Sequence, residues 1–170
     1  MSFFDAVNHS FSTMATGGFS TRNTSIMYFD SPVIDVIIIV FMILASIHFG
    51  GIYAMLIKKS IAPIKNSVTG YYLSVILVFS LFTAFILMLQ GGYGSFGKAL
   101  LDSVFQVVSF ISTTGFGNAD NALWPMLANV FLIFAAFHCG GSGSTTGGIK
   151  ADRMLIIFKE IGNEFKRRLH

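Results

Sequence analysis

Apolar residues in this chain gather into long runs separated by short stretches of small and polar residues. Residues 33–57 and 71–89 are each long enough for a membrane-spanning helix, which needs about 20 residues. Pro32 stands at the first helical position of the earlier run, so we expect one continuous helix there. Two shorter runs, residues 3–14 and 97–111, cannot span a bilayer and predict re-entrant helices.

A stretch of small residues, 112–118, lies between the short run 97–111 and the apolar segment 123–139. Irregular backbone of this kind is tolerated at membrane depth where it lines a water-filled path. Glycine permits conformations that point carbonyl groups at an axis, and such carbonyls replace the hydration shell of a cation in channel filters. From these residues alone, a filter loop and an ordinary loop between two helices are both open.

An internal repeat favours the filter loop. We call residues 15–20 the first loop and residues 112–118 the second loop. The positions that lead into and through the first loop, Asp5, Val7, Ser12, Thr16, Gly18 and Phe19, recur in one register as Asp102, Val104, Ser109, Thr113, Gly115 and Phe116. Further along, Phe41, Ile43, Ala45, His48, Gly50 and Gly51 recur as Phe131, Ile133, Ala135, His138, Gly140 and Gly141. The chain therefore holds two copies of one unit: short helix, Thr/Gly loop, long apolar helix. Units that each give one loop to a central axis are how filters are built.

Composition identifies a membrane protein. Hydrophobic residues make up 54% of the chain and charged residues 11%, whereas soluble domains carry about 25% charged residues. The net charge of +3 is small and does not suggest nucleic-acid binding. The single cysteine, Cys139, gives no disulfide and no metal set. His48 lies in an apolar run, where we expect a hydrogen-bonded helix residue, with an ion ligand as the alternative.

Basic residues predict the topology. They are Lys58, Lys59 and Lys65 after the first spanning run, and Lys159, Lys166, Arg167 and Arg168 near the end of the chain. By the positive-inside rule both groups lie in the cytoplasm, so both Thr/Gly loops enter from the outer side. We divide the chain into a partial repeat (residues 1–59), a cytoplasmic linker (60–70) and a complete repeat (71–170). The chain has no signal-peptide start and begins inside a repeat unit, so we expect a piece of a longer protein.

Residues 140–148 form a glycine-rich segment that resembles a phosphate-binding loop only superficially. The phosphate pattern requires a lysine directly after its last glycine, and this chain has Ile149 there. The segment also follows a helical run rather than a strand. We predict instead a helix broken inside the membrane below the filter, a place where such breaks line the transport path. A hinge without a role in transport is the alternative.

Several motifs of the chain resemble the TrkH/KtrB potassium-uptake family. They are Ser112-Thr113-Thr114-Gly115-Phe116, Trp124-Pro125 and residues 140–150, together with residues 12–20 and Tyr28-Phe29-Asp30-Ser31-Pro32. The resemblance covers essentially all 170 residues and implies an all-α membrane protein with four membrane–pore–membrane repeats. This chain is similar to the second repeat without its first helix, followed by the complete third repeat.

The resemblance also implies which residues act. The potassium-binding filter backbone is Thr16, Gly17, Gly18, Thr113, Thr114 and Gly115. The intramembrane gate beneath it is Gly140, Gly141, Ser142, Gly143, Ser144, Thr145, Thr146, Gly147 and Gly148. Gly17 stands where the second loop has Thr114, which leaves the side-chain role at that position open.

By the same resemblance, the transported substrate is potassium and the chain itself binds no cofactor. The implied protein is a multi-pass homodimer in the bacterial inner membrane, with a cytosolic nucleotide-binding regulatory subunit. A sodium-conducting or weakly selective pore remains open, and so does a non-conducting membrane scaffold, although a scaffold does not need the same loop twice. The sequence offers no Ser/His/Asp set, metal-ligand spacing or phosphate loop for an enzyme.

Overall fold

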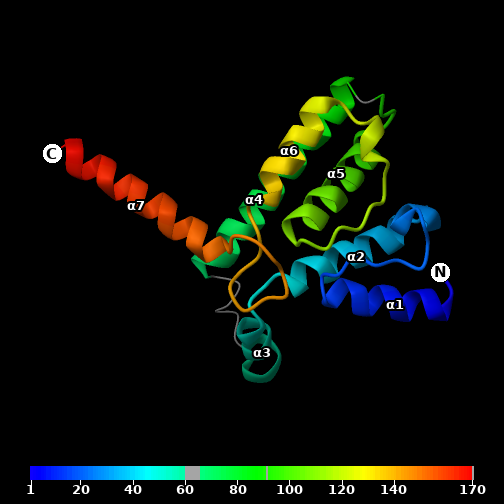
Figure 1. Cartoon of the computed structure of the whole chain (residues 1–170), viewed down its shortest axis with the longest axis horizontal. Helices are drawn as coiled ribbons and strands as arrows, with labels where there is room; N and C mark the ends of the chain where they lie inside the picture. The colour runs from blue at the N-terminus through cyan, green and yellow to red at the C-terminus, as the bar shows by residue number, and fades with distance from the viewer. Residues whose placement is uncertain (60–65, 91, 170) are drawn as a thin grey trace.

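The computed structural model describes residues 1–59, 66–90 and 92–169. Within these ranges the chain is all-helical, as predicted, apart from one isolated bridge between Cys139 and Lys150. The elements, shown in Figure 1, are α1 (Phe3–Met14), the 3-10 helix η1 (Ser25–Phe29), α2 (Pro32–Ala45), α3 (Phe49–Lys58), α4 (Ser67–Gln90), α5 (Phe96–Ile111), the 3-10 helix η2 (Asn121–Leu123), α6 (Met126–Ala136) and α7 (Ala151–Leu169).

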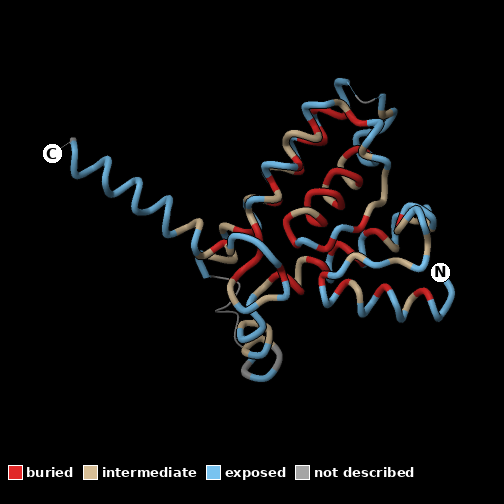
Figure 2. The backbone as a smooth tube through the Cα atoms, viewed as in Figure 1, coloured by how far each residue is buried: buried red, intermediate tan, exposed pale blue. Residues whose placement is uncertain are grey.

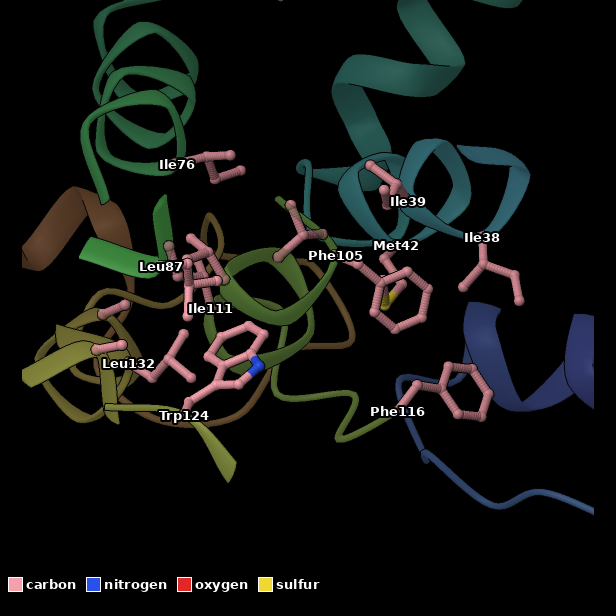
Figure 3. Packing of buried hydrophobic residues seen from close by; sticks show 14 of the residues in the cluster. Ile38, Ile39, Met42, Ile76, Leu87, Phe105, Ile111, Phe116, Trp124 and Leu132 are labelled. Carbon is pink, nitrogen blue, oxygen red and sulfur yellow. The ribbon is translucent and has the colours of Figure 1, made fainter. Parts of the chain in front are cut away.

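Helix α5 is the centre of the fold. It packs against α2 and against both α4 and α6, so apolar side chains on several of its faces are buried. Phe105, Val108 and Ile111 have no exposed surface. Figure 2 shows the buried positions concentrated on α5 and on the helices around it. In Figure 3, Ile111 lies close to Leu87 of α4 and Leu132 of α6. The second loop, which follows α5, therefore leaves from the most firmly packed element.

The two copies of the repeat share one arrangement. Helix α1 packs on α2 as α5 packs on α6. A capping box starts α1, because Ser2 and Asp5 each accept a hydrogen bond from the other's backbone N–H. In the second copy, α4 covers α5 and α6, whereas the apolar side chains of Phe3, Phe4 and Phe11 on α1 are exposed.

The prediction of one continuous helix over residues 33–57 is wrong, because the chain breaks there into α2 and α3. The two helices are bent by 106° at residues 46–48. His48 caps the start of α3, where its Nδ1 accepts a hydrogen bond from Gly50 N at 2.9 Å. His48 is thus hydrogen-bonded, as expected, but at the start of a helix rather than inside one.

A competing hydrogen-bond donor explains this break. In a continuous helix the carbonyl of Ser46 accepts the N–H of Gly50. Here the Ser46 carbonyl instead accepts the N–H of Gly141 at 3.0 Å, and the N–H of Gly50 turns to His48. A partner distant in sequence has therefore replaced the helical one.

The last apolar segment is interrupted as well. Helix α6 has 11 residues, and residues 137–150 lie outside any helix before α7 begins. Helix α7 has 19 residues, projects away from the other helices (Figure 1) and carries Lys166, Arg167 and Arg168 in its last turn. The position of this interruption within a membrane stays a prediction.

Among the described residues, α4 is the one helix that is long and apolar enough to cross a membrane on its own. The bent pair α2 and α3 meets the same test when taken as one span. Helix α4 begins at Ser67, earlier than the predicted residue 71. Residues 60–65 of the predicted cytoplasmic linker, including its basic residue Lys65, lie outside the described residues.

We expect Phe105→Ala in the full-length protein to lower the free energy of unfolding by about 3–5 kcal/mol, because the truncated side chain leaves a cavity beside α5. Phe85→Ala is the matched control, since Phe85 is 60% exposed on α4. Thermal unfolding in detergent micelles measures both. Equal midpoints for the two variants contradict a central position of α5.

Candidate functional site

The two Thr/Gly loops have the same backbone shape. Thr16 and Thr113 have positive φ values of 51° and 56°, and Gly18 and Gly115, two residues later, have 69° and 84°. Left-handed backbone is strained for a β-branched residue, and such strain concentrates at functional sites. The repeat in the sequence is therefore a repeat in the backbone, marked by the threonines as clearly as by the glycines.

Each loop leaves its short helix through matching hydrogen bonds. They are Thr16 N to Thr13 O (3.1 Å) and Gly17 N to Ser12 O (2.8 Å) in the first copy, and Thr113 N to Phe110 O (3.1 Å) and Thr114 N to Ser109 O (3.0 Å) in the second. These bonds satisfy the last carbonyl groups of each helix. The carbonyl groups that follow have no helical donor.

The carbonyl oxygens of the predicted filter residues have no hydrogen-bond donor among the residues that the structure describes. Within the described ranges, none of the six carbonyl oxygens accepts a hydrogen bond from the chain: Thr16, Gly17, Gly18, Thr113, Thr114 and Gly115. Most backbone carbonyls in folded proteins are paired, and unpaired ones are suitable ligands for alkali cations. The described residues contain no group of three or more His, Cys, Asp or Glu side chains that could hold a metal ion instead.

An aspartate of each short helix holds the far limb of its loop. Asp5 Oδ1 accepts a hydrogen bond from Thr21 Oγ1 at 2.6 Å, and Asp102 Oδ1 accepts one from Asn118 Nδ2 at 3.0 Å, at equivalent positions of the repeat. The Thr21 hydroxyl, followed by that of Ser2, holds the pKa of Asp5 well below its usual range, so the carboxylate stays ionised. Each loop is therefore attached at both ends to the helix that precedes it.

A polar cluster strengthens the attachment of the second loop. Besides Asp102, the side-chain amide of Asn118 donates to Asp35 Oδ2 of α2 at 3.3 Å. Gln106 Nε2 donates to Asn118 Oδ1 at 3.3 Å, and Tyr93 donates to the other carboxylate oxygen of Asp102 at 3.0 Å. The far limb of the second loop is thus fixed to α2 as well as to α5.

The two loops are in direct backbone contact. A side-chain carbon added to Gly18 lies 1.9 Å from the carbonyl oxygen of Thr114, so only glycine fits at this point. The 3-10 helix η1, which follows the first loop, also contacts the second loop: Met27 N donates to Gly117 O at 3.0 Å and Gly117 N donates to Ser25 Oγ at 3.2 Å. The loops form one continuous structure, which the sequence alone does not indicate.

The loops differ in their side chains. Thr114 is buried, with its hydroxyl 2.7 Å from Ser112 Oγ, whereas Gly17 at the matching position has no such group. Phe116 is 1% exposed and packs beside His9 of the first copy, but its counterpart Phe19 is 82% exposed. The Thr114 side chain therefore packs within the second loop, and the first loop has no equivalent group at Gly17.

The glycine-rich segment docks on the break between α2 and α3. Besides the bond from Gly141 to Ser46, Thr145 Oγ1 donates to the carbonyl of Ala45 at 3.2 Å. Phe49 N, at the start of α3, donates to the carbonyl of Gly143 at 3.2 Å. The segment thus satisfies backbone groups on both sides of the break.

The same segment also contacts both loops. Thr16 Oγ1 donates to the carbonyl of Thr145 at 2.9 Å, and the Thr145 hydroxyl shares its one hydrogen between the carbonyls of Met14 and Ala45, both at 3.2 Å. Gly147 N donates to Thr113 Oγ1 at 2.8 Å. The structure therefore brings the predicted filter residues and the predicted gate residues together through hydrogen bonds between main-chain and hydroxyl groups.

Internal contacts give the glycine-rich segment its shape. Lys150 Nζ donates to the carbonyl and, at 3.2 Å, to the hydroxyl of Thr146. Ser142 donates to the Asp152 carboxylate from its N–H at 2.9 Å and from its hydroxyl at 2.5 Å. Partial burial raises the pKa of Asp152, but the hydrogen bonds from Ser142 outweigh this and leave the pKa below its ordinary value.

The two ends of the segment meet at a narrow neck. Cys139 N donates to Ile149 O at 3.2 Å, and Ala151 N donates to Gly140 O at 3.1 Å. Gly148 has φ +70°, and a side-chain carbon there lies 2.5 Å from Cys139 Sγ. The segment is therefore a closed loop inserted between α6 and α7 rather than an open linker.

Sequence reasoning predicted both loops and the glycine-rich segment but not the groups that hold them. It singled out neither Ser46 nor Asp152, and it placed a continuous helix where α2 breaks. One signal was available: the repeat aligns the glycine pair 50–51 with the pair 140–141. In that alignment, the position where α2 ends corresponds to within one residue to the position where α6 ends.

Known proteins resemble this chain over its whole length. The profile of the family TrkH, described as cation transport protein, matches residues 1–93 and 67–170. The Trk system potassium uptake protein TrkH of Salmonella typhimurium is 38% identical over 175 residues, and the Trk system potassium uptake protein TrkG of Escherichia coli is 34% identical over 171 residues. The crystal structure of the potassium transporter TrkH from Vibrio parahaemolyticus matches 100% of this chain with a TM-score of 0.93 at 35% sequence identity.

The chain is much shorter than these proteins. It spans 35% of the length of each of the two relatives and 37% of the chain in the crystal structure. The likeness therefore concerns the part of those proteins that the two repeat copies represent.

We expect Gly18→Ala to destabilise the full-length protein by about 1–3 kcal/mol, the usual range for overpacking, because the added methyl group meets the Thr114 carbonyl. Gly117→Ala is the control, since its nearest neighbour lies at 3.8 Å and its φ is not positive. Thermal unfolding midpoints of the two purified variants provide the measurement. A Gly18→Ala protein as stable as wild type argues against contact between the loops.

Proposed function

Since the chain belongs to the TrkH family of cation transport proteins, we propose that it supplies two filter loops of a potassium-conducting pore in a longer uptake protein. The observation that carries this proposal is the pair of matched loops whose carbonyl oxygens have no donor in the described ranges. In each loop, strained backbone and an aspartate attachment hold three consecutive carbonyl groups ready for a cation. A packing loop has no need of unpaired carbonyls at the same three positions twice.

Potassium is the proposed substrate because the relatives covering the chain are named potassium uptake proteins. Backbone carbonyls bind dehydrated monovalent cations without a charged side chain. A sodium-conducting or weakly selective pore uses the same chemistry and is distinguished by flux ratios. A non-conducting scaffold accounts less well for the free carbonyls.

Residues 140–148 are the proposed gate. Their contacts with Thr16 and Thr113 support a position directly beneath the filter loops. The contacts are single hydrogen bonds to small residues, and a barrier held in this way is displaced by a modest bias from a partner. The neck connects the segment directly to α7, so a partner that binds α7 acts on the gate.

The proposal includes a location and partners. The basic end of α7 supports a cytoplasmic C-terminal segment of a multi-pass protein in the bacterial inner membrane. Apolar side chains of α7, among them Ile156, Phe158 and Phe165, are exposed and offer contact surface. The family resemblance supports assembly as a homodimer with a cytosolic nucleotide-binding regulatory subunit of the TrkA/KtrA type.

Gly115→Ser tests the filter. The serine side chain makes φ +84° unfavourable by about 1–2 kcal/mol, so we expect lower potassium uptake or a lower potassium-to-sodium ratio, with expression intact. Gly117→Ser is the control, because Gly117 lies past the loop centre without a positive φ. Rubidium and sodium uptake in potassium-transport-deficient cells expressing the full-length gene gives both quantities. If neither variant changes uptake or ion preference, the filter assignment is wrong.

Deletion of Ser142 to Thr146 tests the gate. If these residues block the path, their removal raises ion flux through the full-length protein in liposomes and weakens its dependence on the regulatory subunit. A hinge predicts the opposite: unchanged or abolished flux in a protein that still folds. Flux with and without the regulatory subunit separates the two readings, and the elution profile of the purified variant controls for folding.

A further inference from the structure

The hydroxyl groups of Thr16 and Thr113 contact the glycine-rich segment in opposite senses. Thr16 Oγ1 donates its hydrogen to the carbonyl of Thr145 at 2.9 Å. Thr113 Oγ1 instead accepts the N–H of Gly147 at 2.8 Å. Thr113 and Gly147 are both exposed in this chain, and so is Gly115 of the same loop. The Thr113 contact therefore lies on the open side of the second loop, next to unpaired carbonyls.

Thr113 Oγ1 is also suited to bind a cation. A hydroxyl oxygen has two lone pairs and, like a carbonyl oxygen, is a neutral oxygen ligand for alkali cations. The N–H of Gly147 already presents positive charge to this oxygen. A cation bound to the same oxygen repels the positive end of the N–H dipole and draws electron density from the oxygen, so the hydrogen bond from Gly147 becomes weaker. The Gly147 N–H and a bound cation therefore weaken each other's interaction with the Thr113 oxygen.

We propose that the Gly147 N–H, when residues 140–148 are docked, and a cation at the inner end of the filter compete for the Thr113 hydroxyl oxygen. The proposal rests on the proposed function, because it requires a cation path along the second loop. Cation binding and docking of the segment are then coupled equilibria, and each weakens the other by the same factor. The transported ion itself promotes release of the gate.

Thr16 provides an internal contrast. Its hydrogen is directed at the carbonyls of Ala15, at 2.7 Å, and Thr145, at 2.9 Å, so its lone pairs remain available. A cation on those lone pairs polarises the hydroxyl and strengthens its donation. The Thr16 contact is therefore compatible with an occupied filter, and the antagonism belongs to Thr113 alone.

Hydrogen–deuterium exchange of the full-length protein in lipid nanodiscs tests the coupling, with the peptide that covers residues 140–148 as the readout. Potassium chloride is compared with N-methylglucamine chloride at equal ionic strength. We expect potassium to speed exchange of this peptide roughly twofold to tenfold, the factor that corresponds to loss of one neutral hydrogen bond.

Three isosteric variants sharpen the test. Thr113→Val removes the acceptor of Gly147, so exchange is fast in both salts and no longer depends on potassium. Thr16→Val loosens the segment but keeps the potassium effect. Thr83→Val behaves like wild type, because the Thr83 hydroxyl lies on α4, outside both loops and the segment, and has no hydrogen-bond partner among the described residues. Thr113→Ala repeats the measurement if valine disturbs folding.

The outcomes are distinguishable from those of the proposed function. Exchange that is independent of potassium in the wild type, or that still depends on it in Thr113→Val, overturns the coupling. Rubidium flux by the same wild-type preparation in liposomes is measured in parallel. Flux without a potassium effect on exchange removes this inference and leaves the pore proposal standing, whereas absence of rubidium flux removes the pore proposal itself.

Discussion

Backbone groups surrounded by apolar side chains must find partners within the protein, and this constraint organises the structure. Where α2 stops at Ala45, its last carbonyls lose their helical donors. The glycine-rich segment supplies replacements, with Gly141 N on the Ser46 carbonyl and the Thr145 hydroxyl on the Ala45 carbonyl. The break after α2 and the shape of the segment therefore depend on the same hydrogen bonds.

The free carbonyls of the two loops are the exception to this constraint, and the surrounding structure explains how they persist. Asp5 and Asp102 hold the far limbs of the loops, and Gly18 brings the loops into backbone contact. Helix α5, buried among α2, α4 and α6, gives the second loop a firm base. The cost of strained, unpaired backbone is thus offset by packing and hydrogen bonds at its two ends, as is usual where strain serves function.

Local patterns predicted much of this fold. The bounds of α1, the run of α5 and the apolar length of α4 follow from periodicity and run length, and the repeat located both loops. The break at residues 46–48 did not follow, because its cause is a hydrogen-bond partner, Gly141, far along the chain. The left-handed conformation of Thr16 and Thr113 could not be predicted from the sequence either, since threonine seldom adopts it. What the sequence could not reveal was which distant groups would meet.

The neck of the glycine-rich segment has a mechanical consequence. Helix α7 starts at this neck and, with 19 residues, is about 28 Å long. A tilt of roughly 10° about the neck moves the far end of such a helix by about 5 Å while residues beside the pivot shift by less than 1 Å. A protein that pulls on the far end of α7 therefore works with reduced displacement and increased force at Gly140. Hydrogen bonds lengthened by a few tenths of an ångström are weakened, so a coarse movement at the far end of the helix is converted into a fine adjustment at the neck.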